Sequence, residues 1–291
     1  MSVLLQISDT HFGTERHEVA EALAALAARQ QPDVVVLSGD ITQRARPAQF
    51  RAAKAFVERL GAPVVAIPGN HDIALFDLWS RFRRPYARYA VAFGNTLEPV
   101  FSSQDLLIVG VNTTRAWRHK HGEVSASQVD RVAGVLATAS ARQLRVVLVH
   151  QPLAVPEPRE RANLLRGHKA AAHAWAAAGA DLVMGGHIHL PYTLAVQGLA
   201  RRLWAVQAGT AVSSRTRSGV PNSVNLVRWE PPKAEAGLPP AQAEPVGACL
   251  IERWDFASDG PGFVRAEVTA VQPDRSSGGC NARAGRAPGP P

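Results

Sequence analysis

The sequence of 291 residues predicts an α/β fold, arranged as a layered sandwich of β-sheets with helices on the outside. The first observation is that apolar runs alternate with Ala- and Leu-rich amphipathic stretches along most of the chain. The second is that short β runs replace the helical pattern from Tyr192 onward. We expect these later runs to form a second sheet packed on the first, within one domain of residues 1–271.

Short apolar runs predict buried strands, and polar residues suited to metal binding follow each of them directly. The runs cover residues 3–7, 34–37, 64–67, 146–149 and 182–184. Residues 18–29 carry apolar side chains at helical spacing, and residues 47–60 begin with proline and stop before Gly61. Both stretches predict crossover helices, so the first three strands are expected to be parallel.

The middle of the chain continues the same pattern. Residues 73–89 mix aromatic and basic side chains and are interrupted at Pro85, whereas residues 106–111 predict another buried strand. Residues 125–136 open with a Ser-x-x-Gln capping box and predict a helix. The short β runs expected in the second sheet are residues 193–196, 203–206, 223–229, 248–254 and 263–268.

Two segments lack the composition of a packed element. Residues 230–245 are rich in Pro, Ala and Glu, which predicts a mobile insertion between two strands. Residues 272–291 have almost no apolar content and predict a disordered tail.

The formal net charge of +8 favours anionic ligands and leaves nucleic acid open as a partner. We do not favour nucleic acid, because arginines such as Arg29, Arg51 and Arg131 fall on predicted helix surfaces as solvated groups. No apolar run approaches the roughly 18 to 20 residues needed to cross a bilayer. We therefore expect a cytoplasmic protein without a membrane span, and a homo-oligomer stays open.

The polar clusters at the strand ends predict a two-metal site. Carboxyl ends of strands in an open α/β sheet border one crevice, so residues far apart in sequence can converge there. Asp9 and His11 suit a first ion together with His189, while Asp40 can bridge to a second ion. The full set of predicted ligands is Asp9, His11, Asp40, Asn70, His150, His187 and His189.

The ligand set also predicts the metal and the chemistry. Nitrogen and oxygen donors without thiolate suit Mn or Fe, with Zn also possible, better than Ca or Mg. Two such ions can generate a hydroxide between them as nucleophile and clamp the attacking and leaving oxygens at phosphorus. His71 follows a predicted ligand and is expected to protonate the leaving oxygen, with Asp72 fixing its tautomer.

These clusters together resemble the calcineurin-like metallophosphoesterases over roughly residues 1 to 230. The resemblance implies a four-layer sandwich of two mixed β-sheets flanked by helices, with a dinuclear metal centre. A narrower likeness, carried by His121-Gly122-Glu123-Val124 and residues 209–223, is to the bacterial branch with the class III cyclic nucleotide phosphodiesterases. That branch usually has two histidines before a proline, where this chain has His150-Gln151-Pro152.

The leading functional prediction is a metal-dependent phosphoric ester hydrolase, acting on cyclic nucleotides or other small phosphodiesters. The residues expected to contact the substrate are Asn112, Arg115, Trp117 and His121. Other hydrolases of the same fold remain open: a phosphomonoesterase or protein phosphatase, a nuclease, or a nucleotide-sugar lipid pyrophosphatase. A noncatalytic metal-binding scaffold is an alternative from a different class, and the intact His71-Asp72 pair argues against it.

Overall fold

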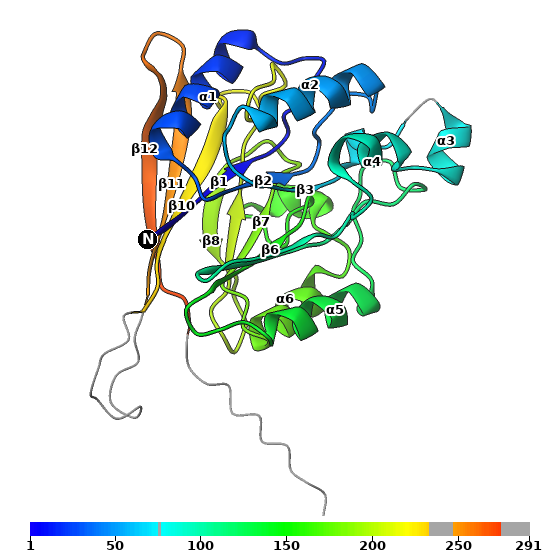
Figure 1. Ribbon diagram of the computed structural model, residues 1–291. Coiled ribbons are helices and arrows are strands. Elements are labelled where there is room, and N and C mark those ends of the chain that lie inside the picture. Colours follow the sequence, from blue (N-terminus) through cyan, green and yellow to red (C-terminus); the bar gives the residue numbers. More distant parts are fainter. Residues whose placement is uncertain (75–76, 233–246, 275–291) are drawn as a thin grey trace, which may run out of the picture.

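The computed structural model describes residues 1–74, 77–232 and 247–274. Its helices and strands form a sandwich with two six-stranded sheets at the centre (Figure 1). Sheet I has the strand order β12-β11-β10-β1-β2-β3, and sheet II has the order β4-β5-β6-β7-β9-β8. Each sheet combines parallel and antiparallel pairs, as the sequence led us to expect.

Sheet I is built from both ends of the chain. Its strands are β1 Ser2–Ile7, β2 Val34–Ser38, β3 Val64–Ile67, β10 Ser223–Glu230, β11 Ala248–Ala257 and β12 Gly262–Val271. The first three are parallel, because the helices α1 (His17–Gln30) and α2 (Pro47–Glu58) cross between them. β10 then runs antiparallel beside β1, with Leu5 opposite Leu226.

Sheet II comes from the middle of the chain. Its strands are β4 Val100–Ser102, β5 Leu106–Gly110, β6 Leu144–Leu148, β7 Leu182–Gly185, β8 Tyr192–Ala195 and β9 Trp204–Gln207. The helices α5 (Ala126–Leu136) and α6 (His168–Ala177) connect its parallel strands. Ser125 caps α5 through the predicted box with Gln128.

The prediction that every strand after Tyr192 belongs to the second sheet is wrong. Only β8 and β9 join sheet II, whereas β10, β11 and β12 return to sheet I. β10 is buried along most of its length and covers the edge of β1, which would otherwise present unpaired backbone groups. Apolar runs reveal that a strand is buried, but they do not reveal which edge it pairs with.

Three apolar clusters separate the four layers. One lies between sheet I and helices α1 and α2, one lies between the two sheets, and one lies between sheet II and helices α5 and α6. Successive side chains of β1 show the division, since Leu4 packs between the sheets and Leu5 packs under the helices. Burial on both faces explains why the strands read as continuous apolar runs.

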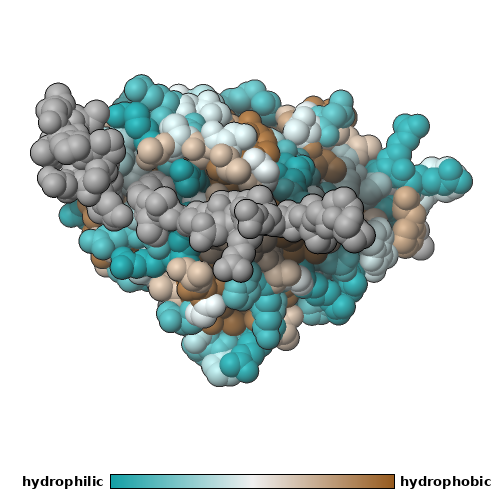
Figure 2. Space-filling model, turned by 90° about the horizontal axis from the view of Figure 1, so that it is seen from below, coloured by the Kyte–Doolittle hydropathy of each residue, from teal (hydrophilic) through white to brown (hydrophobic). Residues whose placement is uncertain are grey.

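The remaining described elements lie at the rim of the sandwich. They are the 3-10 helices η1 Asn70–Asp72 and η2 Pro158–Asn163 and the helices α3 Leu78–Arg83 and α4 Ala87–Phe93. α3 and α4 occupy the segment that we expected to be interrupted at Pro85. Viewed from the side of α5 and α6, hydrophilic residues spread over the surface with smaller hydrophobic areas between them (Figure 2).

Some predictions fall outside what the structure describes. Of the expected insertion at residues 230–245 only residues 230–232 are described, and of the expected tail at residues 272–291 only residues 272–274. None of the helices in the described part of the chain combines the length and the apolar character required to cross a membrane.

Candidate dinuclear metal centre

The polar clusters meet at one edge of the sandwich. Asp9, Asp40 and Asn70 follow the parallel strands β1, β2 and β3 of sheet I, whereas His150 and His187 follow the parallel strands β6 and β7 of sheet II. The carboxyl ends of the parallel strands in both sheets therefore border the same space. The structure brings together all seven residues that the sequence singled out as metal ligands.

The backbone is strained where these residues sit. Seven non-glycine residues of the described chain have positive φ, and five of them are predicted ligands; the other two are Gln31 and Ala45. The five are Asp9 (50°), His11 (41°), Asp40 (50°), His187 (74°) and His189 (55°). Left-handed backbone is unfavourable for such residues, and its concentration here is typical of a functional site.

One group of donors is formed by Asp9, His11 and His189. The Nε2 atoms of the two histidines lie 3.2 Å apart. Asp9 Oδ1 lies 3.3 Å from Nε2 of His189 and 3.8 Å from Nε2 of His11. Three donor atoms that point at one small space can hold a single cation.

A second group surrounds Asp40. Its Oδ1 lies 3.2 Å from His150 Nε2, which in turn lies 3.2 Å from Asn70 Oδ1, and His187 completes the set. The other Asp40 oxygen, Oδ2, lies 3.8 Å from His11 Nε2 of the first group. Asp40 therefore stands between the two groups, as expected of a bridging carboxylate.

Backbone carbonyls orient the histidines from behind. The Nδ1 atom of His150 lies 2.8 Å from the carbonyl oxygen of Ser38, and that of His189 lies 2.5 Å from the carbonyl oxygen of Arg215. If Nδ1 donates its hydrogen to the carbonyl, Nε2 keeps a free lone pair that faces the centre. This arrangement is the one that a metal-binding imidazole requires.

His187 is the clearest sign that something must bind here. Both of its ring nitrogens are buried and have no hydrogen-bond partner among the described residues. Buried polar atoms are otherwise paired in native proteins, so a lone imidazole within a group of carboxylate and histidine donors fits a metal ligand. The donor set therefore fits divalent ions on the structure's own geometry.

Electrostatics favour the ligand forms of several side chains. Burial lowers the pKa of His11 and of His187 to about 3, so both imidazoles are neutral. Burial opposes the ionisation of Asp9, yet the neighbouring His189 outweighs it and lowers the pKa of Asp9 to about 2. His150 differs: burial opposes its charged form, but Asp40, Asp9 and the Ser38 carbonyl together outweigh burial and raise the pKa of His150 to about 9.

Glycines let the loops approach closely. A Cβ atom on Gly69 would lie 2.0 Å from the Asp40 nitrogen, and one on Gly186 would lie 1.9 Å from Ser8 Oγ and 2.4 Å from Asp9 Oδ2. Behind them, Gln6 of β1 donates to the Gly185 carbonyl at 2.9 Å and so joins sheet I to the loop that carries His187. No pattern in the sequence indicates this buried link.

His71 lies beside both groups. Its backbone N–H donates to Asp40 Oδ1 at 2.8 Å, and its Nδ1 lies 3.0 Å from the Gln43 carbonyl oxygen. Its Nε2 lies 3.3 Å from the Arg215 guanidinium. Because a guanidinium only donates, Nε2 accepts this bond and Nδ1 carries the hydrogen that goes to Gln43.

The expectation that Asp72 fixes the tautomer of His71 is wrong, because the Gln43 carbonyl does so. The fully buried Asp72 carboxylate instead accepts the N–H groups of Ile41, Thr42 and Gly69 and the hydroxyl of Thr42. These bonds tie the loop after β2 to the loop after β3. Asp72 thus positions Asp40 and Asn70 rather than the His71 ring.

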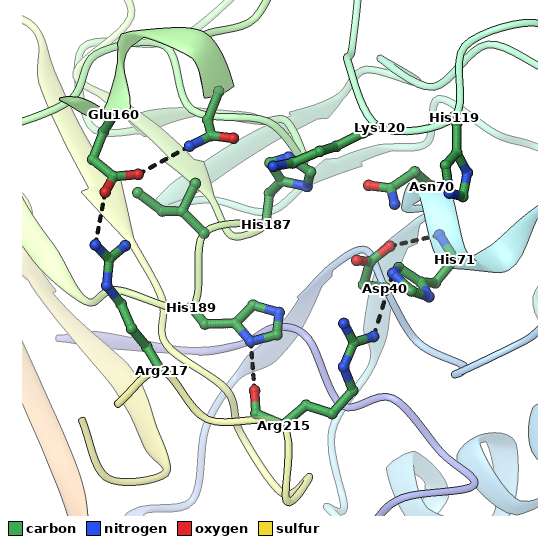
Figure 3. A pocket seen from close by; sticks show the side chains of 12 residues that line it. Asp40, Asn70, His71, His119, Lys120, Glu160, His187, His189, Arg215 and Arg217 are labelled. Atoms are coloured by element: carbon green, nitrogen blue, oxygen red, sulfur yellow. Dashed lines mark hydrogen bonds and ion pairs between the residues drawn. The ribbon is translucent and has the colours of Figure 1, made fainter. Parts of the chain in front are cut away.

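The centre opens into a cavity of about 440 Å³, which we call the catalytic cavity. Figure 3 shows Asp40, Asn70 and His71 on one side and Glu160 and Arg217 on the other, with Arg215 and His189 between them. Glu160 accepts from Arg217 at 2.7 Å and from Asn163 at 2.9 Å. The residues that line the catalytic cavity are Asp40, Asn70, His71, His119, Lys120, Glu160, Asn163, His187, Ile188, His189, Arg215 and Arg217.

The expected substrate contacts are not among these residues. Asn112 and Arg115 line a separate cavity, where Arg115 donates to the Asn112 carbonyl and to Gln128. Trp117 is 67% exposed, and His119 with Lys120 reaches the catalytic cavity in place of His121. The sequence therefore indicated the correct loop, residues 115–121, but not the two side chains of that loop that line the catalytic cavity, His119 and Lys120.

Sequence reasoning also missed Glu160 and Asn163, and it covered Arg215 and Arg217 only as part of residues 209–223. The guanidinium of Arg215 lies at the centre, where it donates a hydrogen bond to the side-chain oxygen of Gln43 at 2.9 Å. A single arginine in a loop of this basic chain gives no signal of where its side chain points.

The fold and the site define the class of protein. The model of the calcineurin-like phosphoesterase family matches residues 2–191, and the chain belongs to that family. A dimetal phosphatase from Danio rerio shares the fold, with a TM-score of 0.61 at 14% identity over 94% of this chain and 99% of that chain. The resemblance inferred from the sequence, including the four-layer sandwich, is thereby confirmed.

Two curated relatives narrow the comparison. A cAMP/cGMP dual specificity phosphodiesterase of Mycobacterium tuberculosis is 30% identical over 206 residues, which cover 64% of this chain and 61% of that protein. A glycerophosphodiester phosphodiesterase of Enterobacter lignolyticus is 37% identical over 81 residues, covering 24% of this chain and 29% of that protein. The chain thus spans less than two thirds of the length of either relative.

Proposed function

We propose that this protein is a metal-dependent phosphoric ester hydrolase that cleaves small phosphodiesters, with cyclic nucleotides as the leading substrates. The observation that carries the proposal is the pair of donor groups joined through Asp40, at the floor of a cavity that Lys120 and Arg215 also line. A noncatalytic scaffold would not need His71 and Arg215 to converge on the same point.

Two divalent ions fit the two donor groups. Asp9, His11 and His189 would hold one ion, and Asn70, His150 and His187 would hold the other, with Asp40 between them. Nitrogen and oxygen donors of this kind suit Mn or Fe, and Zn is also compatible. When bound, such ions supply an activated water and positive charge against the phosphoryl oxygens.

The chain's own residues handle the substrate and the leaving group. Arg215 donates toward the space beside His71 and can bind a nonbridging phosphoryl oxygen. Once substrate draws the guanidinium away, the lone pair on Nε2 of His71 is free to take up a proton from water and pass it to the leaving oxygen, while the Gln43 carbonyl holds the ring. Lys120 adds positive charge at the wall of the cavity, where Arg217 is paired with Glu160.

The cavity favours a small substrate over a folded phosphoprotein. Its volume of about 440 Å³ lies within the roughly 300 to 1,000 Å³ usual for small-molecule sites. The polar wall of Glu160, Asn163 and Arg217 can hydrogen-bond the part of the substrate beyond the phosphorus. The names of the two relatives, one acting on cyclic nucleotides and one on glycerophosphodiesters, support a small phosphodiester.

A substrate panel tests the proposal. Purified protein loaded with Mn is assayed on cAMP, cGMP, glycerophosphoethanolamine, bis-p-nitrophenyl phosphate and p-nitrophenyl phosphate, with Asp40→Asn as the inactive variant. Asp130→Asn on the exposed face of α5 is the matched control. We expect the diesters to exceed the monoester and Asp40→Asn to abolish turnover. Cleavage of the monoester alone, or of none of these esters, would overturn the assignment.

A further inference from the structure

A second cavity lies beside the catalytic cavity and has no part in the proposed reaction. Its volume is about 320 Å³, and its walls come from the segment after His150, from η2, from α6 and from β8 with the turn that follows it. Much of its surface is apolar: Leu153, Leu164, Ala172, Leu194, Val196 and Leu199. We call it the second cavity.

The rim of the second cavity is cationic. Arg161, His168, Lys169 and His173 line it, and no acidic residue is among the lining. In the described part of the chain, no carboxylate forms an ion pair with Arg161, Lys169 or His173. By contrast, the nearby Arg217 is paired with Glu160 at 2.7 Å.

The first turn of α6 reinforces this positive potential. The helix has no acidic residue in that turn and carries His168 and Lys169 there instead. A helix N-terminus presents partial positive charge, and the ammonium group of Lys169 at this end adds to it. The rim therefore combines the charges of Arg161 and Lys169 with the positive end of α6, around an apolar floor.

Neighbouring contacts hold the second cavity in shape. Tyr192 of β8 donates its hydroxyl to the Ala154 carbonyl at 2.6 Å, which fixes one wall against another. η2 separates the two cavities, since Glu160 and Asn163 face the catalytic cavity while Arg161 and the following Leu164 face the second. The space is thus a preformed pocket rather than a gap between loose loops.

We propose that the second cavity binds an anionic amphiphile, a single unbranched apolar chain with a carboxylate or phosphate head group. The head would lie among Arg161, Lys169 and His173, and the chain would cover Leu194 and the neighbouring apolar residues. A peptide strand fits less well, because β8 offers an edge of only four residues. A purely polar anion would leave the apolar floor exposed.

Calorimetric titration of the whole chain with octanoate and decanoate tests this site. Burial of each methylene contributes about 0.8 kcal/mol, so each added methylene should tighten binding by up to about 4-fold and decanoate should bind roughly 10-fold more tightly than octanoate. Decanol and decyltrimethylammonium serve as neutral and cationic probes with the same chain. Both should bind at least about 10-fold more weakly than decanoate.

Substitutions locate the site. Lys169→Glu should weaken decanoate binding by about 10-fold, whereas Arg51→Glu, an equal charge change at an exposed position of α2, should leave it unchanged. Leu194→Gln should reduce the gain from chain length without affecting the preference for an anionic head. The proposal fails if decanoate does not bind, if decanol binds equally well, or if Lys169→Glu and Arg51→Glu behave alike. Because binding is measured without turnover, this outcome is independent of the proposed hydrolase activity.

Discussion

Asp72→Ala provides a sharp test of how the centre is held, because the sequence and the structure assign this residue different roles. The sequence suggests that Asp72 acts through the His71 ring. In the structure its carboxylate accepts from Ile41 N at 3.0 Å, Thr42 N at 2.8 Å, Thr42 Oγ1 at 2.9 Å and Gly69 N at 2.9 Å. We therefore expect the main effect of the substitution to be on stability.

The size of the effect follows from these contacts. Removing the carboxylate leaves three buried N–H groups without an acceptor, at a cost of about 1 to 3 kcal/mol each. Water that enters the emptied space recovers part of this, so we expect a loss of about 4 kcal/mol in the free energy of unfolding. For a domain of this size the melting temperature should fall by roughly 8 to 15 °C. Asp72→Asn keeps one acceptor and should lose about half as much.

Urea unfolding and steady-state kinetics on the same samples separate the two roles. Stability is measured with saturating Mn and again with chelator, so that lost metal is not mistaken for lost hydrogen bonds. His71→Ala is the counterpart, because it should lower kcat by about 10²- to 10³-fold and change stability by less than about 1 kcal/mol. If Asp72→Ala matched His71→Ala in both respects, the reasoning from these hydrogen bonds would be refuted.

Further predictions concern the metals and the cavity. Chelator should abolish hydrolysis and Mn or Fe should restore it, with Asp40→Ala losing the most metal in elemental analysis; full activity in chelator would contradict this. His71→Ala should lose least on esters whose leaving groups need no protonation, and an equal loss on all esters would exclude a general acid. Arg215→Gln should raise KM for cyclic nucleotides and for bis-p-nitrophenyl phosphate alike by about 10-fold, because the phosphoryl group is common to both. Trp117→Ala should change neither KM, and a rise for the nucleotide alone would restore the role first expected of it.

Much of the site could be predicted because the candidate metal ligands directly follow strands that are recognisable in the sequence. Each strand is buried on both faces and reads as an apolar run, so the position just after it is visible in the sequence. The types and order of Asp9, Asp40, Asn70, His150 and His187 then specify a centre. The strained backbone at several of these positions had no counterpart in the sequence pattern.

The rest depended on side-chain direction and on pairing over long distances. A run of apolar residues does not indicate that β10 pairs with β1 of sheet I rather than with a strand of sheet II. In the same way, Arg115 and Arg215 look alike in sequence, yet Gln128 holds one away from the centre and Gln43 draws the other toward it. Asp72 was misread because its partners are backbone N–H groups of two loops, which no residue pattern reveals.

We propose that the two donor groups joined by Asp40 make a two-metal phosphodiesterase. The most direct measurement is to titrate chelator-stripped protein with Mn while recording both bound metal and hydrolysis of cyclic AMP or bis-p-nitrophenyl phosphate. We predict that turnover rises with metal occupancy and reaches its plateau at about two ions per chain. Turnover without metal, or a plateau of bound metal with no hydrolysis of any phosphodiester, would contradict the claim.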